Sequence, residues 1–145
     1  MGEKTFSSRK KLHDDAPGIF RSFFVFFAPS LLALLIKMPV TKQIIQEGDG
    51  NTFPQAGQQL EMHYDGTLED GTVFDSSRRK GRPFKFVIGV GQVIQGWDEG
   101  VMTMSLGEKA KLTITGDMAY GPAGIDGIIP PNATLIFEVE LLKLG

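Results

Sequence analysis

"GVGQVIQGWDEG", residues 89–100, contains four glycines and the only tryptophan of the chain. A glycine-rich turn before a helix can bind phosphate, but the dinucleotide-binding pattern G-x-G-x-x-G requires glycine where this chain has Ile94. The stretch also lacks the Gly-Lys-Ser/Thr of a P-loop and any basic side chain. We therefore expect backbone roles for its glycines: Gly89 and Gly91 in a turn out of a strand, and Gly96 in a close approach beside the tryptophan.

Beyond residue 38, only the segment 93–104 has the pattern of a helix, and it is short. Residues 59–68 alternate as a strand does, with Leu60, Met62 and Tyr64 on one face and polar side chains on the other. Further strands are predicted at 40–45, 72–77, 83–88, 109–114 (Ala110, Leu112 and Ile114 on one face) and 134–142 (Leu135, Phe137, Val139 and Leu141 on one face). These segments predict an α+β fold in which a sheet of about five antiparallel strands buries one face against one short helix.

The composition excludes several kinds of chemistry. With 41% hydrophobic and 22% charged residues, the chain can bury an ordinary globular core. It has no cysteine, which excludes disulfides, thiol catalysis, Cys-ligated zinc and iron–sulfur clusters. Its two histidines make a His-built metal site improbable, and we expect neither a metal nor a cofactor. The segment 116–131, with four glycines and three prolines, is a long loop of the kind that usually carries function.

Charge divides the chain into two unlike parts. Residues 1–37 carry six Lys/Arg and three Asp/Glu, a net charge of +3, whereas residues 38–145 carry nine and fourteen, a net charge of −5. The acidic part has no basic stripe along an element, so nucleic acid is not expected as a partner. We predict an N-terminal extension at 1–37 and a folded domain at 38–145.

The extension contains a short hydrophobic segment within residues 19–36. Its apolar run, residues 23–36, is 14 residues long, short of the roughly 20 that a transmembrane helix needs. Three interpretations remain open: an uncleaved signal-anchor, a poor signal peptide, or a dispensable extension ahead of a natural start at Met38. A cytoplasmic location is predicted for the domain. The alternative, a membrane-anchored or secretory protein, depends only on this segment.

Conventional catalytic groups are poorly placed in the domain. His63 is expected on the outward face of a strand, and the adjacent Asp98 and Glu99 diverge on a helix and form a solvated face. Several aromatic and aliphatic residues instead lie near turns. Each of them taken alone could be an ordinary core residue. Taken together, they could line an apolar binding site in which Tyr hydroxyls are the polar groups. These residues are Tyr64, Phe74, Phe84, Val93, Ile94, Trp97, Tyr120, Ile129 and Phe137.

Five motifs carry a resemblance to a known family: "FDSSRRKGRPFKF" (74–86), "GVGQVIQGWDEGV" (89–101), "SLGEKAKLTI" (105–114), "AYGPAG" (119–124) and "IIPPNATLIFEVELLKLG" (128–145). In order and spacing the chain from about residue 40 to 145 resembles the FKBP-type prolyl isomerases, the tacrolimus- and rapamycin-binding immunophilins. The resemblance implies a strongly twisted five-stranded antiparallel sheet that wraps around one short helix. It also implies an apolar pocket between them, and no cofactor.

The resemblance assigns site residues by motif. The catalytic set would be Tyr64, Phe74, Asp75, Trp97, Tyr120 and Phe137, and the substrate- or macrolide-binding set would be Phe84, Gln92, Val93, Ile94, Ile128 and Ile129. Trp97 would form the floor, and the Ile94 backbone N–H would donate to a ligand carbonyl. Ile128 and Ile129, together with Phe137, would close the far side.

The implied function is peptidyl-prolyl cis–trans isomerisation that assists folding, with X-Pro polypeptides, tacrolimus and rapamycin as ligands. Calcineurin or the TOR kinase would be engaged through the drug complex. The family often pairs the pocket Asp with Arg, where this chain has Lys80, which lacks a bidentate fork. The loop tip also differs, with Ile125 and Asp126 in place of an aromatic or His followed by Pro. These departures keep a non-catalytic binding module open as the alternative.

Overall fold

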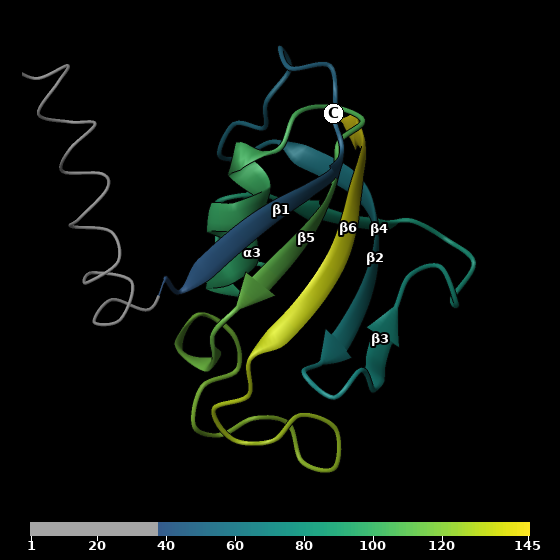
Figure 1. The fold of residues 1–145 in the computed structure, drawn as a ribbon. Coiled ribbons are helices and arrows are strands. Elements are labelled where there is room, and N and C mark those ends of the chain that lie inside the picture. The colour runs from purple at the N-terminus through teal and green to yellow at the C-terminus, as the bar shows by residue number, and fades with distance from the viewer. Residues whose placement is uncertain (1–37) are drawn as a thin grey trace, which may run out of the picture. The chain divides into compact units, whose positions relative to one another are not determined.

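Apolar residues at every second position build one antiparallel sheet. The computed structural model describes residues 38–145, so the predictions on residues 1–37 lie outside the described part. The strands are β1 (Val40–Gln46), β2 (Gln59–Leu68), β3 (Val73–Ser76), β4 (Phe84–Val87), β5 (Lys109–Ile114) and β6 (Leu135–Leu144). They follow the order β1-β5-β6-β2-β3, with β4 also paired to β2 (Figure 1).

The edge beside β2 is shared by two strands. β4 pairs with residues 59–62 of β2, and β3 pairs with residues 65–67, so the two lie along different parts of the same neighbour. The connection between them, residues 77–83, leaves the sheet and returns (Figure 1). Six strand segments therefore occupy five positions, which agrees with the predicted sheet.

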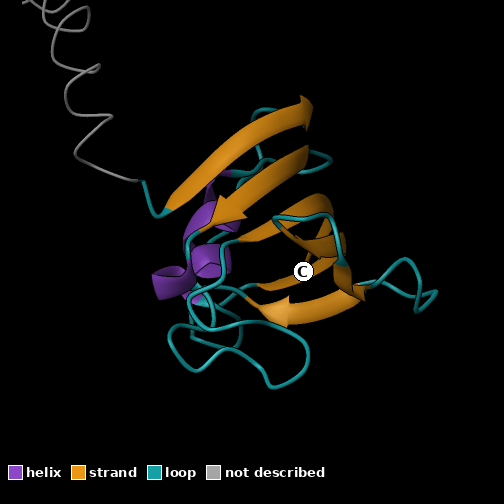
Figure 2. Cartoon of the chain, turned by 60° about the horizontal axis from the view of Figure 1, so that its bottom comes forward, coloured by secondary structure: helices purple, strands orange, loops and turns teal. Residues whose placement is uncertain are grey.

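The predicted inward faces are confirmed. Leu60, Met62 and Tyr64 of β2 are at most 7% exposed, and Leu112 and Ile114 of β5 are fully buried. β6 pairs with β2 on one side and with β5 on the other, so its inward-facing residues lie beside those of both strands. The core is the concave side of this sheet, where the helical segments lie (Figure 2).

The helix is shorter than predicted. The segment 93–104 was expected to be helical, but α3 spans Gln95–Gly100 and passes into a 3-10 turn, η1 (Val101–Thr103). Ile94, with φ −57° and ψ 148°, is extended and precedes the first helical residue. Val93 and Ile94 therefore lie before the helix and not within it. A second 3-10 turn, η2 (Gly116–Met118), opens the long loop between β5 and β6.

The helix packs against β5 because Gly96 has no side chain. A Cβ atom at Gly96 would lie 2.8 Å from Cδ1 and 2.9 Å from Cγ1 of Ile114, which is fully buried and cannot move aside. The predicted close approach at this glycine is confirmed. Among residues 38–145, no helix has the length and apolar character needed to span a membrane.

We expect Gly96→Ala to destabilise the domain by up to about 2 kcal/mol, because overpacking a closed core costs about 1–3 kcal/mol. The better helix propensity of alanine offsets only about 1 kcal/mol of this. The matched control is Gly100→Ala, whose Cβ would lie 3.1 Å from Leu112 Cδ1, a looser contact, and which should lose less stability than Gly96→Ala. Urea unfolding measures both, and equal stability of the two variants would contradict the packing role of Gly96.

Candidate active site

A cavity of about 490 Å³ opens beside the start of α3. Side chains of β2, β3 and β4, the turn before the helix, the helix itself and the long loop contribute to its wall. The lining residues are Tyr64, Phe74, Asp75, Lys80, Phe84, Gln92, Val93, Ile94, Trp97, Tyr120 and Phe137. The wall is therefore mainly apolar and aromatic, which is the usual character of a small-ligand site.

Trp97 is held by surrounding aromatic rings. Its ring centroid lies 5.1 Å from that of Tyr64 and 5.3 Å from that of Phe137, with interplanar angles of 84° and 83°. Phe84 and Phe86 also approach it, at 6.0 Å and 5.5 Å. Edge-to-face pairs of this kind are favourable beyond the area they bury. The indole is 3% exposed, and its Nε1 has no hydrogen-bond acceptor within residues 38–145.

Gly66, which sequence reasoning missed, makes room for two rings of the wall. A Cβ atom there would lie 2.7 Å from Cζ of Phe74 and 2.9 Å from Cε1 of Phe137. Those two rings meet edge to face, with centroids 5.5 Å apart. A glycine on the apolar face of an alternating strand, in line with Leu60, Met62 and Tyr64, is the signal that could have identified it.

One carboxylate supplies the polar edge of the cavity. The Tyr64 hydroxyl donates to Asp75 Oδ2 at 2.6 Å, and Lys80 Nζ lies 2.7 Å from Asp75 Oδ1. Burial raises the pKa of Asp75, but the hydrogen bonds from Lys80 and Tyr64 and the lysine charge outweigh it, so this pKa lies below its ordinary value. Burial, and then the bond to Asp75, raise the pKa of Tyr64 well above its ordinary value. The phenol therefore remains a donor and the carboxylate remains ionised at neutral pH.

The departure from Arg to Lys80 does not leave the carboxylate without a cation. The amine reaches a single oxygen of Asp75, and Tyr64 occupies the other. Two donors thus replace the two that a bidentate guanidinium would offer. Lys80 also lines the cavity, although it was singled out in the sequence only as a departure.

Two further donors border the cavity. Tyr120, on the long loop, is 39% exposed, and burial followed by the charge of Asp75 raises the pKa of its phenol. The backbone N–H of Ile94 has no acceptor within residues 38–145. Both groups are therefore available to a ligand carbonyl.

Asp98 fixes the turn that leads into the helix. Its Oδ1 accepts from Gly89 N at 2.8 Å and its Oδ2 from Gly91 N at 3.0 Å, and both glycines have positive φ. The expectation that Asp98 only forms a solvated helix face is wrong for this reason. Gln92, directly after Gly91, accepts from Val87 N at 2.9 Å through its side-chain oxygen and lines the cavity.

Two predicted site residues lie elsewhere. Ile129 was expected to close the pocket, but it is 3% exposed and belongs to the core beneath the long loop, where its backbone bonds to Ile125. Ile128 is 52% exposed on that loop, and neither residue lines the cavity. His63 is half-buried on the outer sheet face, with Nδ1 2.9 Å from Ser77 Oγ.

Comparison with known proteins identifies the family of the chain. The family model described as "FKBP-type peptidyl-prolyl cis-trans isomerase" matches residues 50–142. A peptidyl-prolyl cis-trans isomerase of Schizosaccharomyces pombe is 61% identical over 108 residues, which are 74% of this chain and 96% of that protein. FK506-binding protein 1 of Rhizopus delemar is 61% identical over 108 residues, 74% of this chain and 100% of that protein.

Fold, cavity and relatives together define an enzyme that rotates the peptide bond before proline. The chain belongs to the FKBP-type peptidyl-prolyl cis-trans isomerases, as its motifs predicted. The predicted family, fold class and enzyme activity are thereby confirmed.

We expect Lys80→Gln to raise the pKa of Asp75, since the substitution removes both a hydrogen bond and a positive charge. Because the folded pKa lies below the ordinary value of about 3.9, the Asp75 carboxylate stabilises the fold above that pH. This contribution is lost as the pH falls through the folded pKa. A carboxyl-carbon NMR titration measures the shift. Lys85→Gln, which removes the partner of Glu61, should leave Asp75 unchanged, and an unaltered Asp75 in Lys80→Gln would contradict the pairing.

Proposed function

We propose that the cavity beside α3 is where the X-Pro bond rotates, with the proline ring against Trp97. The observation that carries this proposal is the aromatic floor combined with a single polar edge, built from Asp75 and Tyr64. Such a site needs no nucleophile and no metal, because rotation breaks no covalent bond.

The physical task is to lower a resonance barrier. Peptide rotation costs about 18–20 kcal/mol because the C–N bond must lose its double-bond character. For X-Pro the two isomers differ by only about 0.5–1 kcal/mol, so the reaction is slow but nearly balanced. In the twisted state the carbonyl loses resonance polarity and suffers less from the loss of water than the planar amide does. An apolar wall therefore favours the transition state over the ground state.

Individual side chains divide this task in the proposal. Trp97 and Phe137 hold the proline ring while the preceding carbonyl turns, and Phe74 and Phe84 exclude water at the side and the rim. The Ile94 N–H and the Tyr120 hydroxyl donate to substrate carbonyls. Asp75 supplies a fixed negative charge near the turning amide.

Macrolide binding follows from the same cavity. The relative in Rhizopus delemar is named an FK506-binding protein, and FK506 is tacrolimus. We propose that tacrolimus and rapamycin occupy the substrate cavity of this chain, and that the complex presents the exposed Ile128 to calcineurin or the TOR kinase. A cytoplasmic location is proposed with it, and membrane association through residues 19–36 stays a prediction.

A non-catalytic binding module, the alternative that the sequence left open, is not favoured. Its motive was the loss of the family's Arg, but Lys80 pairs with Asp75 at 2.7 Å, which supports a working site. NMR measurement of cis–trans exchange in a proline peptide distinguishes the enzyme from the binding module, since only catalysis increases the exchange rate.

We expect Trp97→Leu and Phe74→Ala to lower kcat/KM in a protease-coupled X-Pro assay by about 10- to 100-fold. The reason is that each removes about 1.4–3 kcal/mol of apolar contact from the reacting proline. Phe86→Leu is the matched control, because Phe86 packs against Trp97 without lining the cavity. Circular dichroism verifies that each variant is folded. Normal turnover in both wall variants would overturn the proposed site.

We expect Asp75→Val to weaken tacrolimus binding more than it lowers turnover. Removal of the carboxylate leaves the Tyr64 hydroxyl and Lys80 without their partner beside a rigid ligand, whereas rotation depends mainly on the apolar floor. Calorimetric titration gives the affinity and the peptide assay gives the rate. The reverse order of effects would count against the role given to Asp75.

A further inference from the structure

We propose that the loop at residues 77–83 is a specificity element that favours X-Pro substrates with acidic residues near the proline. This inference rests on the proposed function, because it assigns a substrate class to the same cavity. The loop joins β3 to β4 and projects beyond the edge of the sheet (Figure 1).

Positive charge is concentrated in this part of the domain. Residues 38–145 contain nine Lys/Arg against fourteen Asp/Glu, yet five of the nine lie within residues 78–85. The segment 76–87 contains no Asp or Glu. A local positive field in an otherwise acidic domain attracts anionic groups to this place and repels them elsewhere.

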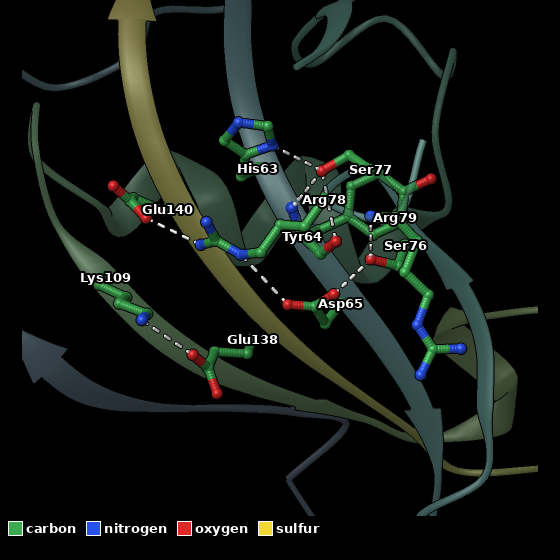
Figure 3. A network of polar contacts seen from close by, with 10 residues as sticks. All are labelled: His63, Tyr64, Asp65, Ser76, Ser77, Arg78, Arg79, Lys109, Glu138 and Glu140. Atoms are coloured by element: carbon green, nitrogen blue, oxygen red, sulfur yellow. Dashed lines mark hydrogen bonds and ion pairs between the residues drawn. The ribbon is translucent and has the colours of Figure 1, made fainter. Parts of the chain in front are cut away.

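Three of the five cations are neutralised within the domain. Arg78 lies 3.2 Å from Asp65 Oδ2 and 2.8 Å from Glu140 Oε2 on the outer sheet face (Figure 3). Lys80 pairs with Asp75, and Lys85 lies 3.0 Å from an oxygen of Glu61.

The other two cations, Arg79 and Arg82, have no carboxylate within 4.0 Å among residues 38–145, and both are exposed. In Figure 3 the Arg79 side chain points away from the network that engages Arg78. Their guanidinium groups can therefore take an external carboxylate without giving up an internal one. Guanidinium also matches the planar geometry of a carboxylate.

The backbone beneath these two arginines is fixed. Arg79 N donates to Ser76 Oγ at 3.2 Å, and Arg82 N donates to Ser77 O at 3.3 Å. Ser77 is 2% exposed and in turn accepts from Tyr64 N at 2.8 Å through its hydroxyl oxygen. A loop that is tied to β2 in this way loses less conformational entropy when a substrate is bound.

The loop also borders the cavity. Lys80, between the two arginines in the chain, and Phe84, two residues after Arg82, both belong to the lining. A peptide advances at most about 3.6 Å per residue, so an acidic residue a few positions from the bound proline lies within reach of an Arg side chain. An acidic segment of the substrate fits better than a nucleic acid or an anionic membrane, because both extended surfaces would also meet the acidic remainder of the domain.

The test measures kcat/KM of the full chain for pairs of X-Pro peptides, at low and at high salt. The two peptides of a pair differ only in having Glu or Gln at one position, before or after the X-Pro bond. We expect the Glu peptide to have a higher kcat/KM at low salt by about twofold to fivefold, the range of exposed ion pairs. High salt should remove the difference. Arg79→Gln with Arg82→Gln should bring the ratio close to one without altering turnover of the Gln peptide.

Lys111→Gln is the matched control, since Lys111 is an exposed cation on β5, outside the cavity, and should leave the ratio unchanged. A ratio of one in the parent, or a ratio that survives the double substitution, would falsify the inference. Inhibition by an acidic peptide without proline that equals inhibition by the same peptide with proline would also contradict it. Arginine-dependent binding to an oligonucleotide or to anionic vesicles, with no effect on the peptide ratio, would contradict it as well. Absent turnover of the Gln peptide would instead overturn the proposed function, so the two failures are distinguishable.

Discussion

The packing of Trp97 among four aromatic rings is the constraint on which the rest of the structure depends. The indole is the largest side chain in the domain, and it reaches this place only because α3 lies close against β5. That approach requires Gly96 opposite Ile114. The rings of Tyr64 and Phe137 then meet Trp97 edge to face from two neighbouring strands. The cavity floor is thus a part of the hydrophobic core that was left uncovered on one side.

The polar edge of the cavity follows a different principle, in which the two charged side chains of the lining, Asp75 and Lys80, are paired with each other. Asp75 is ionised because Tyr64 and Lys80 hold its two oxygens. The neighbouring Arg78 is drawn to the outer face by Asp65 and Glu140. In the proposed reaction the amide would therefore meet a fixed electrostatic environment, and little reorganisation would be needed as the bond turns.

The sequence predicted the sheet well because alternation is a local property that burial enforces. The bounds of β2 and β5 agree with those predicted, and their inward faces are buried as expected. The start of the helix could not be predicted, since Val93 and Ile94 are apolar enough for a helix and only the turn fixed by Asp98 excludes them. The place of Ile129 was equally hidden, because the path of the long loop depends on its own backbone hydrogen bonds. The Lys80 pairing required the three-dimensional position of the loop relative to Asp75.

The division of one sheet edge between β3 and β4 has a consequence for association between molecules. An uninterrupted edge strand would present a row of free N–H and C=O groups on which another chain could pair. Here each edge segment has four residues, and a projecting cationic loop separates them. At the opposite edge, β1 carries a bulge between Ile44 and Gln46. Both edges of the sheet are therefore poor templates for aggregation. This protection depends on the divided edge at β3 and β4 and on the bulge in β1.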